Sequence, residues 1–350
     1  MINLLRKNLS PKVKERIIHF LPFRLMYRRA LSGHEARFSC ELTTKCNVRC
    51  NICTRSHLIK EGMLSVGDMP PELVERVVEE IRRFTEYGKR VYFVPLGLGE
   101  PLLYKDLFGL FGRIKKISGN IGIVLVTNGL LLTEESVKRL IGLGIDEVSV
   151  SLNAGNKDDY KEYMGLDAYK KICANIEAAI KLRNESGRTR PGIFVQYIDY
   201  GGGPAALKDG IRKWNSIMKF NDKCYVHPIV NQAGLFRDGY GYRALARKYP
   251  CNEPLWRVAI KVNGDMYPCD SSLYSGSEKL ESLYLGNIGT DSPFEMYLDP
   301  KSRQRRIVEL MRKDDYSTLA QCRNCNTYKL GCNAYFGLPG NLRIKGYRWI

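Results

Sequence analysis

Three cysteines near the start of the chain are the residues best suited to chemistry. Cys46, Cys50 and Cys53 stand in C-x3-C-x2-C order within eight residues. A loop of that length can bring three thiolates onto one inorganic centre, and soft sulfur ligands suit an iron–sulfur cluster. A [4Fe–4S] cube has four irons, so three cysteines leave one iron open to another ligand. A zinc loop short of its fourth ligand, or three core cysteines, are the alternatives.

A second set of cysteines occupies the last hundred residues: Cys251, Cys269, Cys322, Cys325 and Cys332. Residues 258–268 predict a β-hairpin that turns at Asn263-Gly264, and such a hairpin brings the first two cysteines together. The next two follow in C-x2-C order. Four thiolates complete the coordination of a zinc ion or of a [4Fe–4S] cluster, so both remain open here.

Short apolar runs alternate with amphipathic segments, and these elements must position the cysteines. The alternation predicts six β/α units, which implies a parallel sheet with right-handed crossovers. Six units fall short of a closed eight-unit barrel. We therefore expect an α/β fold, an open partial (β/α)6 TIM-like barrel followed by a small β-hairpin/α cluster-binding domain. The expected strands are 38–42, 91–94, 121–126, 147–152, 193–198 and 225–230, and the expected helices are 70–87, 107–116, 133–142, 167–183 and 204–218.

Glycine-rich or short polar stretches follow the second, third and fourth expected strands, just as the cysteine loop follows the first. The chemistry of such sheets lies at the carboxyl ends of the strands. Glycine lets a backbone approach a ligand closely, and short polar side chains can bind hydroxyl and carboxylate groups. The candidate residues at these strand ends are Gly99, Glu100, Pro101, Asn128, Ser151 and Asn153.

The cysteine motif, with Leu42-Thr43-Thr44-Lys45 before it and Thr54-Arg55 after it, resembles that of the radical S-adenosylmethionine (radical SAM) family. The resemblance implies that the three cysteines hold a [4Fe–4S] cluster whose open iron binds S-adenosylmethionine. The reduced cluster then cleaves this cofactor to a 5′-deoxyadenosyl radical. The strand-end residues would contact the cofactor, with Glu100 near its amino group. Leu98 replaces the first glycine of the family's usual glycine-glycine-glutamate-proline motif, so only Gly99–Pro101 match directly.

The second cysteine set resembles the auxiliary-cluster extensions called SPASM and twitch. Its C-x12-G-x4-C half matches closely, whereas Phe336 stands where a further cysteine of the two-cluster version would fall. Five cysteines cannot fully ligate two clusters. The resemblance therefore implies one auxiliary [4Fe–4S] cluster, with Cys332 as a spare or alternative ligand.

The same resemblance implies a reaction. The radical would abstract a hydrogen atom, and the auxiliary cluster would then take an electron from the substrate. Asp270 follows Cys269 directly, and in sulfatase-maturing relatives an aspartate at that position is the base, so Asp270 is the candidate catalytic residue. A small polyol or sugar-like metabolite is the expected substrate, and an external flavodoxin- or ferredoxin-type donor the electron source. Modification of a peptide or protein side chain, and a non-catalytic cluster protein that binds nucleic acid or membrane, are the alternatives.

Composition places these parts in context. The chain has 350 residues, a net charge of +18 and eleven cysteines. No run of about 18 apolar residues predicts a membrane span, and no secretion signal is evident, so we expect a reducing, cytoplasmic setting without disulfides. Residues 1–35 predict a basic amphipathic lead-in that packs on the main domain or touches an anionic membrane, and no nucleic acid partner is expected. The barrel is expected over 36–235 and the auxiliary domain with its basic tail over 236–350.

Overall fold

The computed structural model describes residues 35–200, 203–228, 251, 253–313, 315–323 and 325. Its strands are β1 Glu35–Cys40, β2 Arg90–Pro95, β3 Gly122–Thr127, β4 Glu147–Asn153, β5 Gly192–Asp199, β6 Lys223–Pro228, β7 Arg257–Ile260, β8 Asp265–Tyr267 and β9 Gly286–Asn287. Its α-helices are α3 Thr54–Lys60, α4 Pro71–Glu86, α5 Leu107–Ile117, α6 Glu134–Gly142, α7 Lys157–Met164, α8 Tyr169–Glu185, α9 Gly203–Ile217, α10 Pro293–Leu298, α11 Arg303–Arg312 and α12 Ala320–Arg323. Short 3₁₀ helices are η1 Pro101–Leu103, η3 Glu253–Leu255 and η4 Asp270–Tyr274.

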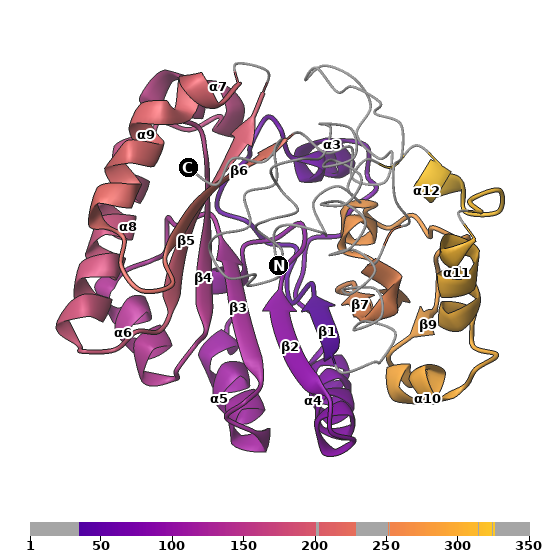
Figure 1. Ribbon diagram of the computed structural model, residues 1–350. Helices are drawn as coiled ribbons and strands as arrows, with labels where there is room; N and C mark the ends of the chain where they lie inside the picture. Colours follow the sequence, from indigo (N-terminus) through magenta and orange to yellow (C-terminus); the bar gives the residue numbers. More distant parts are fainter. Residues whose placement is uncertain are drawn as a thin grey trace, which may run out of the picture.

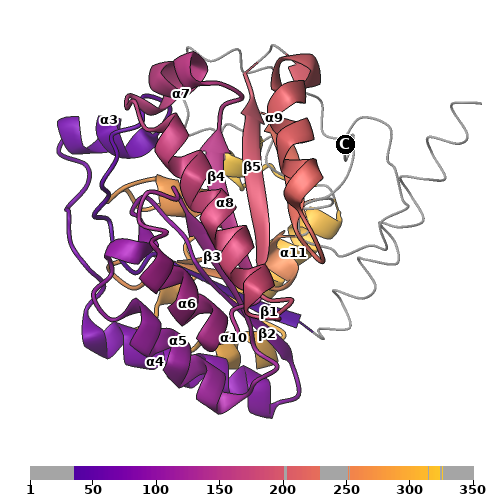
Figure 2. The ribbon, with the colours of Figure 1, turned by 90° about the vertical axis from the view of Figure 1, so that its left-hand side faces the viewer.

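The strands form one sheet in the order β6-β5-β4-β3-β2-β1-β7-β8-β9, with β1 to β6 parallel. Helices α4, α5, α6, α8 and α9 cover its outer face (Figures 1 and 2). Strands β6 and β9 form the two edges, so the sheet is open. The expected partial barrel of six parallel β/α units is confirmed.

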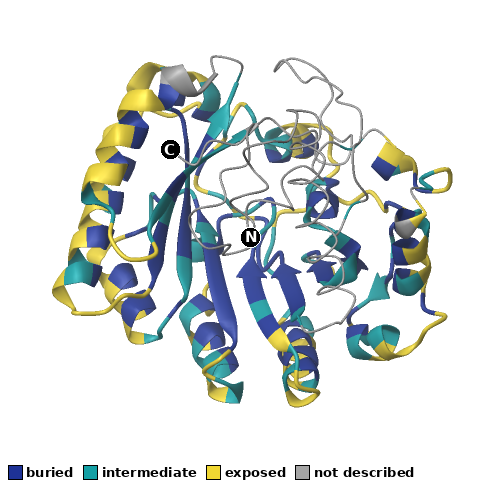
Figure 3. Ribbon diagram, viewed as in Figure 1, coloured by how far each residue is buried: buried dark blue, intermediate teal, exposed yellow. Residues whose placement is uncertain are grey.

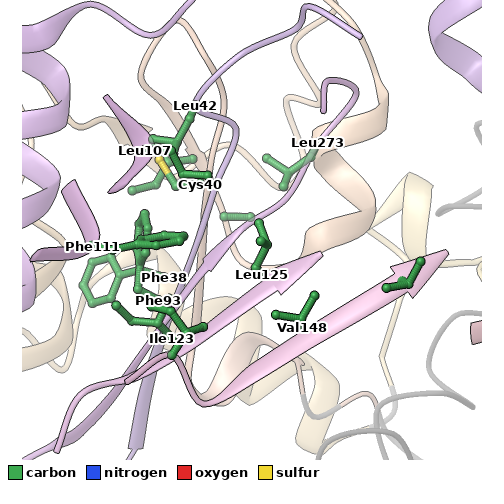
Figure 4. Close-up of a cluster of buried hydrophobic side chains, with 14 of the residues drawn as sticks. Phe38, Cys40, Leu42, Phe93, Leu107, Phe111, Ile123, Leu125, Val148 and Leu273 are labelled. Atoms are coloured by element: carbon green, nitrogen blue, oxygen red, sulfur yellow. The ribbon is translucent and has the colours of Figure 1, made fainter. Parts of the chain in front are cut away.

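The core lies between the sheet and the helices, as apolar periodicity requires. Helix α4 buries Val74, Val77, Ile81 and Phe84 against the strands, while its opposite face is exposed (Figure 3). Residues of β1, β2, β3 and β4 meet side chains of α5 in the same cluster (Figure 4). The clearest examples are Phe38, Phe93, Phe111, Leu125 and Val148.

A C-terminal hairpin extends this sheet. Strand β7 pairs in parallel with β1 and antiparallel with β8, and the turn lies at Gly264, whose φ of +88° suits glycine. The expected hairpin turn is therefore confirmed. Its register against β1 places Cys269, which follows β8, beside the barrel rather than on a detached unit.

Several expected boundaries were wrong. The first strand, expected at 38–42, is β1 at 35–40, because Glu41 and Leu42 leave the β2 ladder. The sixth, expected at 225–230, begins at Lys223, and residues 229–230 lie outside the described ranges. Helices α3 and α7 were not expected, since each is short and lies inside a strand-to-helix connection. The expected lead-in, up to residue 34, also lies outside the described ranges.

The described helices offer no candidate for a membrane span, since none is both long and apolar enough.

A buried ion pair fixes the amino-terminal end of the β5 and β6 region. Two guanidinium nitrogens of Arg183 in α8 donate to the two carboxylate oxygens of Asp222 at 2.6 Å each, and both side chains are fully buried. Asp222 also accepts hydrogen bonds from the backbone N–H groups of Lys219 and Ile193. Such a pair is costly to break, because its surviving partner stays charged inside the protein.

We expect Asp222→Ala to lower the free energy of unfolding by about 3–5 kcal/mol, because Arg183 is left buried without its counter-ion. Urea denaturation measures the change. Lys181→Ala is the matched control on the same helix, since its pair with Glu185 is exposed and such pairs contribute about 0.3–0.5 kcal/mol. Equal losses in the two variants would contradict this assignment.

Candidate functional site

Cys46, Cys50 and Cys53 lie together on the loop that leaves β1, and all three are half-buried free thiols. Burial raises the pKa of Cys50 to about 12, and like charge on Cys53 and Cys46 acts in the same direction. The three sulfurs are thus close enough for the charge of one thiolate to raise the pKa of another. Three neighbouring thiolates require a cationic partner to offset their charge. This all-sulfur donor set fits an iron–sulfur cluster held by three cysteines.

The glycine-rich segment after β2 presses against the start of this loop. The N–H of Glu100 donates to the carbonyl oxygen of Lys45 at 2.8 Å. A Cβ at Gly99 would stand 2.1 Å from the carbonyl oxygen of Thr43 and 2.8 Å from that of Lys45, so only glycine permits the approach. The segment therefore sets the position of the backbone immediately before Cys46.

The carboxylate of Glu100 is buried and joins two strand ends. It accepts hydrogen bonds from the Thr127 hydroxyl at 2.7 Å and from the backbone N–H groups of Asn128 at 2.8 Å and Leu102 at 3.1 Å. Burial raises its pKa, and these donors oppose the rise. The side chain thus holds the ends of β2 and β3 together, and its expected contact with the amino group of S-adenosylmethionine stays a prediction.

Asn128 connects β3 to the cysteine loop. Its side-chain N–H donates to the Asn47 side-chain oxygen at 2.8 Å and lies 4.0 Å from the Cys46 sulfur. Its own oxygen accepts from the backbone N–H of Leu130 at 3.0 Å. The structure therefore brings this predicted residue to the cysteines, at hydrogen-bond reach of one of them.

Helix α7, which was not expected, supports the other side of the loop. The Asn51 side chain donates to the carbonyl oxygen of Glu162 at 2.6 Å, and the N–H of Ile52 donates to that of Tyr163 at 3.3 Å. No local motif marks α7 as a support. The signal available was its amphipathic pair of Tyr160 and Met164, both buried.

Ser151 and Asn153 end β4. Asn153 has a left-handed backbone, φ +62°, where the register between β4 and β5 shifts. Its side-chain oxygen is buried, and no described residue donates a hydrogen bond to it. An unfilled buried acceptor at a strand end suits a ligand donor such as a hydroxyl or ammonium group. Pro101, predicted beside Glu100, is buried at the start of η1.

The auxiliary cysteines gather on the far side of β1. Burial raises the pKa of Cys251 well above its ordinary value, and like charge on Cys325 and Cys322 contributes. Burial likewise raises the pKa of Cys269 to about 12, with a contribution from Cys325. Four of the five predicted cysteines thus lie together, and Cys332 lies outside the described residues. No group of Cys, His, Asp or Glu in the described ranges is arranged to hold a single metal ion.

Asp270 begins η4, directly after Cys269. One of its oxygens accepts from Arg257, which also pairs with Glu253 and donates to the Ser39 hydroxyl at 2.9 Å. Its other oxygen is buried, and no described residue donates a hydrogen bond to it. The carboxylate is therefore anchored through one oxygen, while the other is a buried acceptor without a donor among the described residues.

Comparison with known proteins identifies the chain. The model of the radical SAM superfamily matches residues 40–199, and that of SPASM, an iron–sulfur cluster-binding domain, matches residues 251–326. The chain belongs to the radical SAM superfamily. A [4Fe–4S] cluster and S-adenosylmethionine are accordingly its cofactors, and the SPASM domain indicates auxiliary iron–sulfur binding.

Curated relatives match a little under half of the chain. The tungsten-containing aldehyde ferredoxin oxidoreductase cofactor-modifying protein of Pyrococcus furiosus is 31% identical over 158 residues, 45% of this chain and 42% of that protein. A probable GTP 3′,8-cyclase of Thermoplasma volcanium is 34% identical over 151 residues, 43% of this chain and 41% of that protein. The chain thus spans about two fifths of the length of these relatives.

Solved radical SAM structures share the fold. BtrN in complex with AdoMet and 2-DOIA is 18% identical with a TM-score of 0.53, over 83% of this chain and 92% of that chain. Streptococcus suis SuiB bound to the precursor peptide SuiA is 13% identical with a TM-score of 0.58, over 87% and 73%. Native anSMEcpe with bound AdoMet is 16% identical with a TM-score of 0.59, over 83% and 90%. At these identities the likeness shows the fold alone.

We expect the triple variant Cys46→Ala, Cys50→Ala, Cys53→Ala to lose one cluster after anaerobic reconstitution. Iron analysis should fall from about eight to about four irons per chain, and cleavage of S-adenosylmethionine should stop, because three thiolates are removed from one centre. Replacing Cys251 and Cys269 should also remove about four irons but leave the other cluster.

The control is Cys173→Ala, since this thiol is buried in the hydrophobic core. It should leave the iron content unchanged. Eight irons in the triple variant would contradict the assignment of the first site, and zinc in place of iron would contradict that of the second.

Proposed function

We propose that this radical SAM enzyme abstracts a hydrogen atom from a small, neutral polyol or sugar-like metabolite and oxidises it. The observation that carries the proposal is a row of neutral hydrogen-bonding side chains across β4, β5 and β6. This interior row consists of Ser151, Gln196 and Tyr225, which occupy matching positions in the register of the three strands.

The interior row faces away from the helices. Along β4 and β5, the alternate residues Val150 and Val195 are buried in the hydrophobic core, so Ser151 and Gln196 point to the opposite face. The Tyr225 hydroxyl donates to the Gln196 side-chain oxygen at 3.3 Å. That contact leaves the Gln196 amide N–H groups for a ligand, since no described residue accepts a hydrogen bond from them. A ligand hydroxyl is a fitting acceptor.

Charged groups of the same face gather at its other end. Glu147 begins β4 and Lys223 begins β6. The positive charge of Arg37 on β1 opposes the rise that burial causes in the pKa of Glu147. Burial lowers the pKa of His227, one step beyond the interior row, to about 4, so its imidazole is neutral at pH 7. Neutral donors and acceptors near the strand ends favour an uncharged, hydroxyl-rich substrate over one with ionised groups.

The chain's own residues would complete the chemistry. When bound, the cofactors supply a hydrogen-abstracting 5′-deoxyadenosyl radical and a one-electron acceptor. Asp270, anchored by Arg257 and with one oxygen unpartnered in the described part of the chain, would take the proton that leaves the substrate as it is oxidised. The interior row would orient the substrate carbon, and Asn128 and Asn153 would bind S-adenosylmethionine beside the cysteine loop.

Further parts of the proposal rest on sequence. An external flavodoxin- or ferredoxin-type protein would supply electrons in the cytoplasm. The basic residues 1–35 would touch an anionic membrane surface. SuiB was solved with the precursor peptide SuiA and anSMEcpe with the Cp18Cys peptide, so peptide modification is the outcome against which the metabolite proposal is tested.

We expect the loaded enzyme to form more 5′-deoxyadenosine with a neutral polyol than without it. The panel is inositols and sugar alcohols, with aminocyclitols, which carry an ammonium group, and short peptides as the comparison. Deuterium on the reacting carbon should appear in 5′-deoxyadenosine. Gln196→Leu should lower kcat/KM about tenfold, since one hydrogen bond to substrate is lost, and leave cleavage without substrate unchanged. Deuterium transfer from peptides alone would contradict the proposal.

Asp270→Asn keeps the shape of the side chain but removes its basicity. We expect this variant to form 5′-deoxyadenosine and to take deuterium from the substrate, while oxidised product falls by about 10²–10⁴-fold. Product analysis by mass spectrometry measures the split. Full product formation would show that Asp270 is not the base. If cleavage of S-adenosylmethionine were lost as well, the role of Asp270 would be structural, through its ion pair with Arg257.

A further inference from the structure

We propose that Arg55 is a buried counter-charge that raises the reduction potential of the cluster bound by Cys46, Cys50 and Cys53. This assignment is independent of the substrate. Arg55 would act on the cluster through its positive charge, without binding an iron atom.

The geometry places Arg55 across the base of the cysteine loop. It stands in the first turn of α3, two residues after Cys53. Its side chain reaches back to the other end of the loop, where Nε donates to the carbonyl oxygen of Thr44 at 2.7 Å. Thr44 precedes Cys46 by two residues. The Arg55 side chain therefore connects the segment after the third cysteine to the segment before the first.

Arg55 is only 7% exposed. A buried guanidinium normally pairs with a carboxylate, as Arg183 does with Asp222 and Arg257 with Asp270. No carboxylate of the described residues forms an ion pair with Arg55. Arg55 follows Cys53 by two residues, and Thr44, whose carbonyl oxygen it binds, precedes Cys46 by two. The three thiols are therefore the anionic groups that this cation faces.

The positive charge of Arg55 should affect the reduction potential of the cluster. A cluster held by three thiolates is anionic, and reduction adds one further negative charge. A buried cation stabilises the more negative state more strongly, because the low-dielectric surroundings screen it little. The potentials of protein-bound clusters depend on net charge and solvent exposure in this way. Removing the cation should therefore make the cluster harder to reduce.

Arg49 offers a matched control within the same loop. It lies between Cys46 and Cys50, carries the same charge and is exposed, so water and salt screen it. The variants Arg55→Gln and Arg49→Gln thus remove one positive charge each from the same loop, one buried and one solvated.

The experiment is a redox titration followed by electron paramagnetic resonance, with iron analysis of each sample. It uses the full chain with Cys322 and Cys325 replaced by Ser, so that one cluster remains. In Arg55→Gln we expect the equilibrium constant for one-electron reduction to fall at least about tenfold, a shift of 59 mV to lower potential. Arg49→Gln should shift the potential by less than a third of that, and Arg55→Lys should stay near the parent.

Two results in iron-loaded samples would overturn the proposal. An unchanged potential in Arg55→Gln, or equal shifts in Arg55→Gln and Arg49→Gln, would show that the buried charge does not act on the cluster. Where Arg55→Gln binds no iron, Arg55→Lys decides. Iron regained with Lys supports a requirement for charge, whereas iron lost from both folded variants assigns Arg55 to its hydrogen bond with Thr44 alone.

Discussion

The site depends on the placement of Glu100. Its backbone N–H donates to the carbonyl oxygen of Lys45, the residue before Cys46, and its carboxylate accepts from Leu102 in η1 and from the end of β3. A buried carboxylate is tolerated only when donors surround it, so these loops are fixed relative to one another as long as the group is buried. Glu100 thus fixes the position of the cysteine loop relative to Asn128 and the strands.

A second buried carboxylate extends this arrangement to the auxiliary site. Glu41, at the exit of β1, accepts from the N–H groups of Leu98 beside Gly99 and Val262 in the hairpin. Burial raises its pKa to about 7, and the backbone donors and the nearby Lys261 oppose the rise. Because β7 also pairs directly with β1, the two cysteine sets flank one strand. Their separation is therefore set by the sheet rather than by a linker.

The sequence predicted what depends on local pattern. Cysteine spacing, the Asn263-Gly264 turn and apolar periodicity are readable along the chain, and the six parallel units with polar strand ends followed from them. Long-range register is not readable in this way, so the alignment of Ser151 with Gln196 and Tyr225 appears only in the folded sheet. Arg55 was missed because arginine is normally exposed, and its burial follows from a contact with Thr44 across the loop. Asp270 was predicted from its position after Cys269, and its role stays a prediction, whereas its contact with Arg257 on β7 is not readable from the sequence.

We infer that Cys46, Cys50 and Cys53 hold a cluster with one iron open to S-adenosylmethionine. Electron–nuclear double resonance on the reduced, reconstituted chain, with the cofactor's amino nitrogen labelled with ¹⁵N, tests it most directly. Hyperfine coupling between the labelled nitrogen and the cluster is the expected result. A reduced cluster that shows no coupling to the label at saturating cofactor would contradict it.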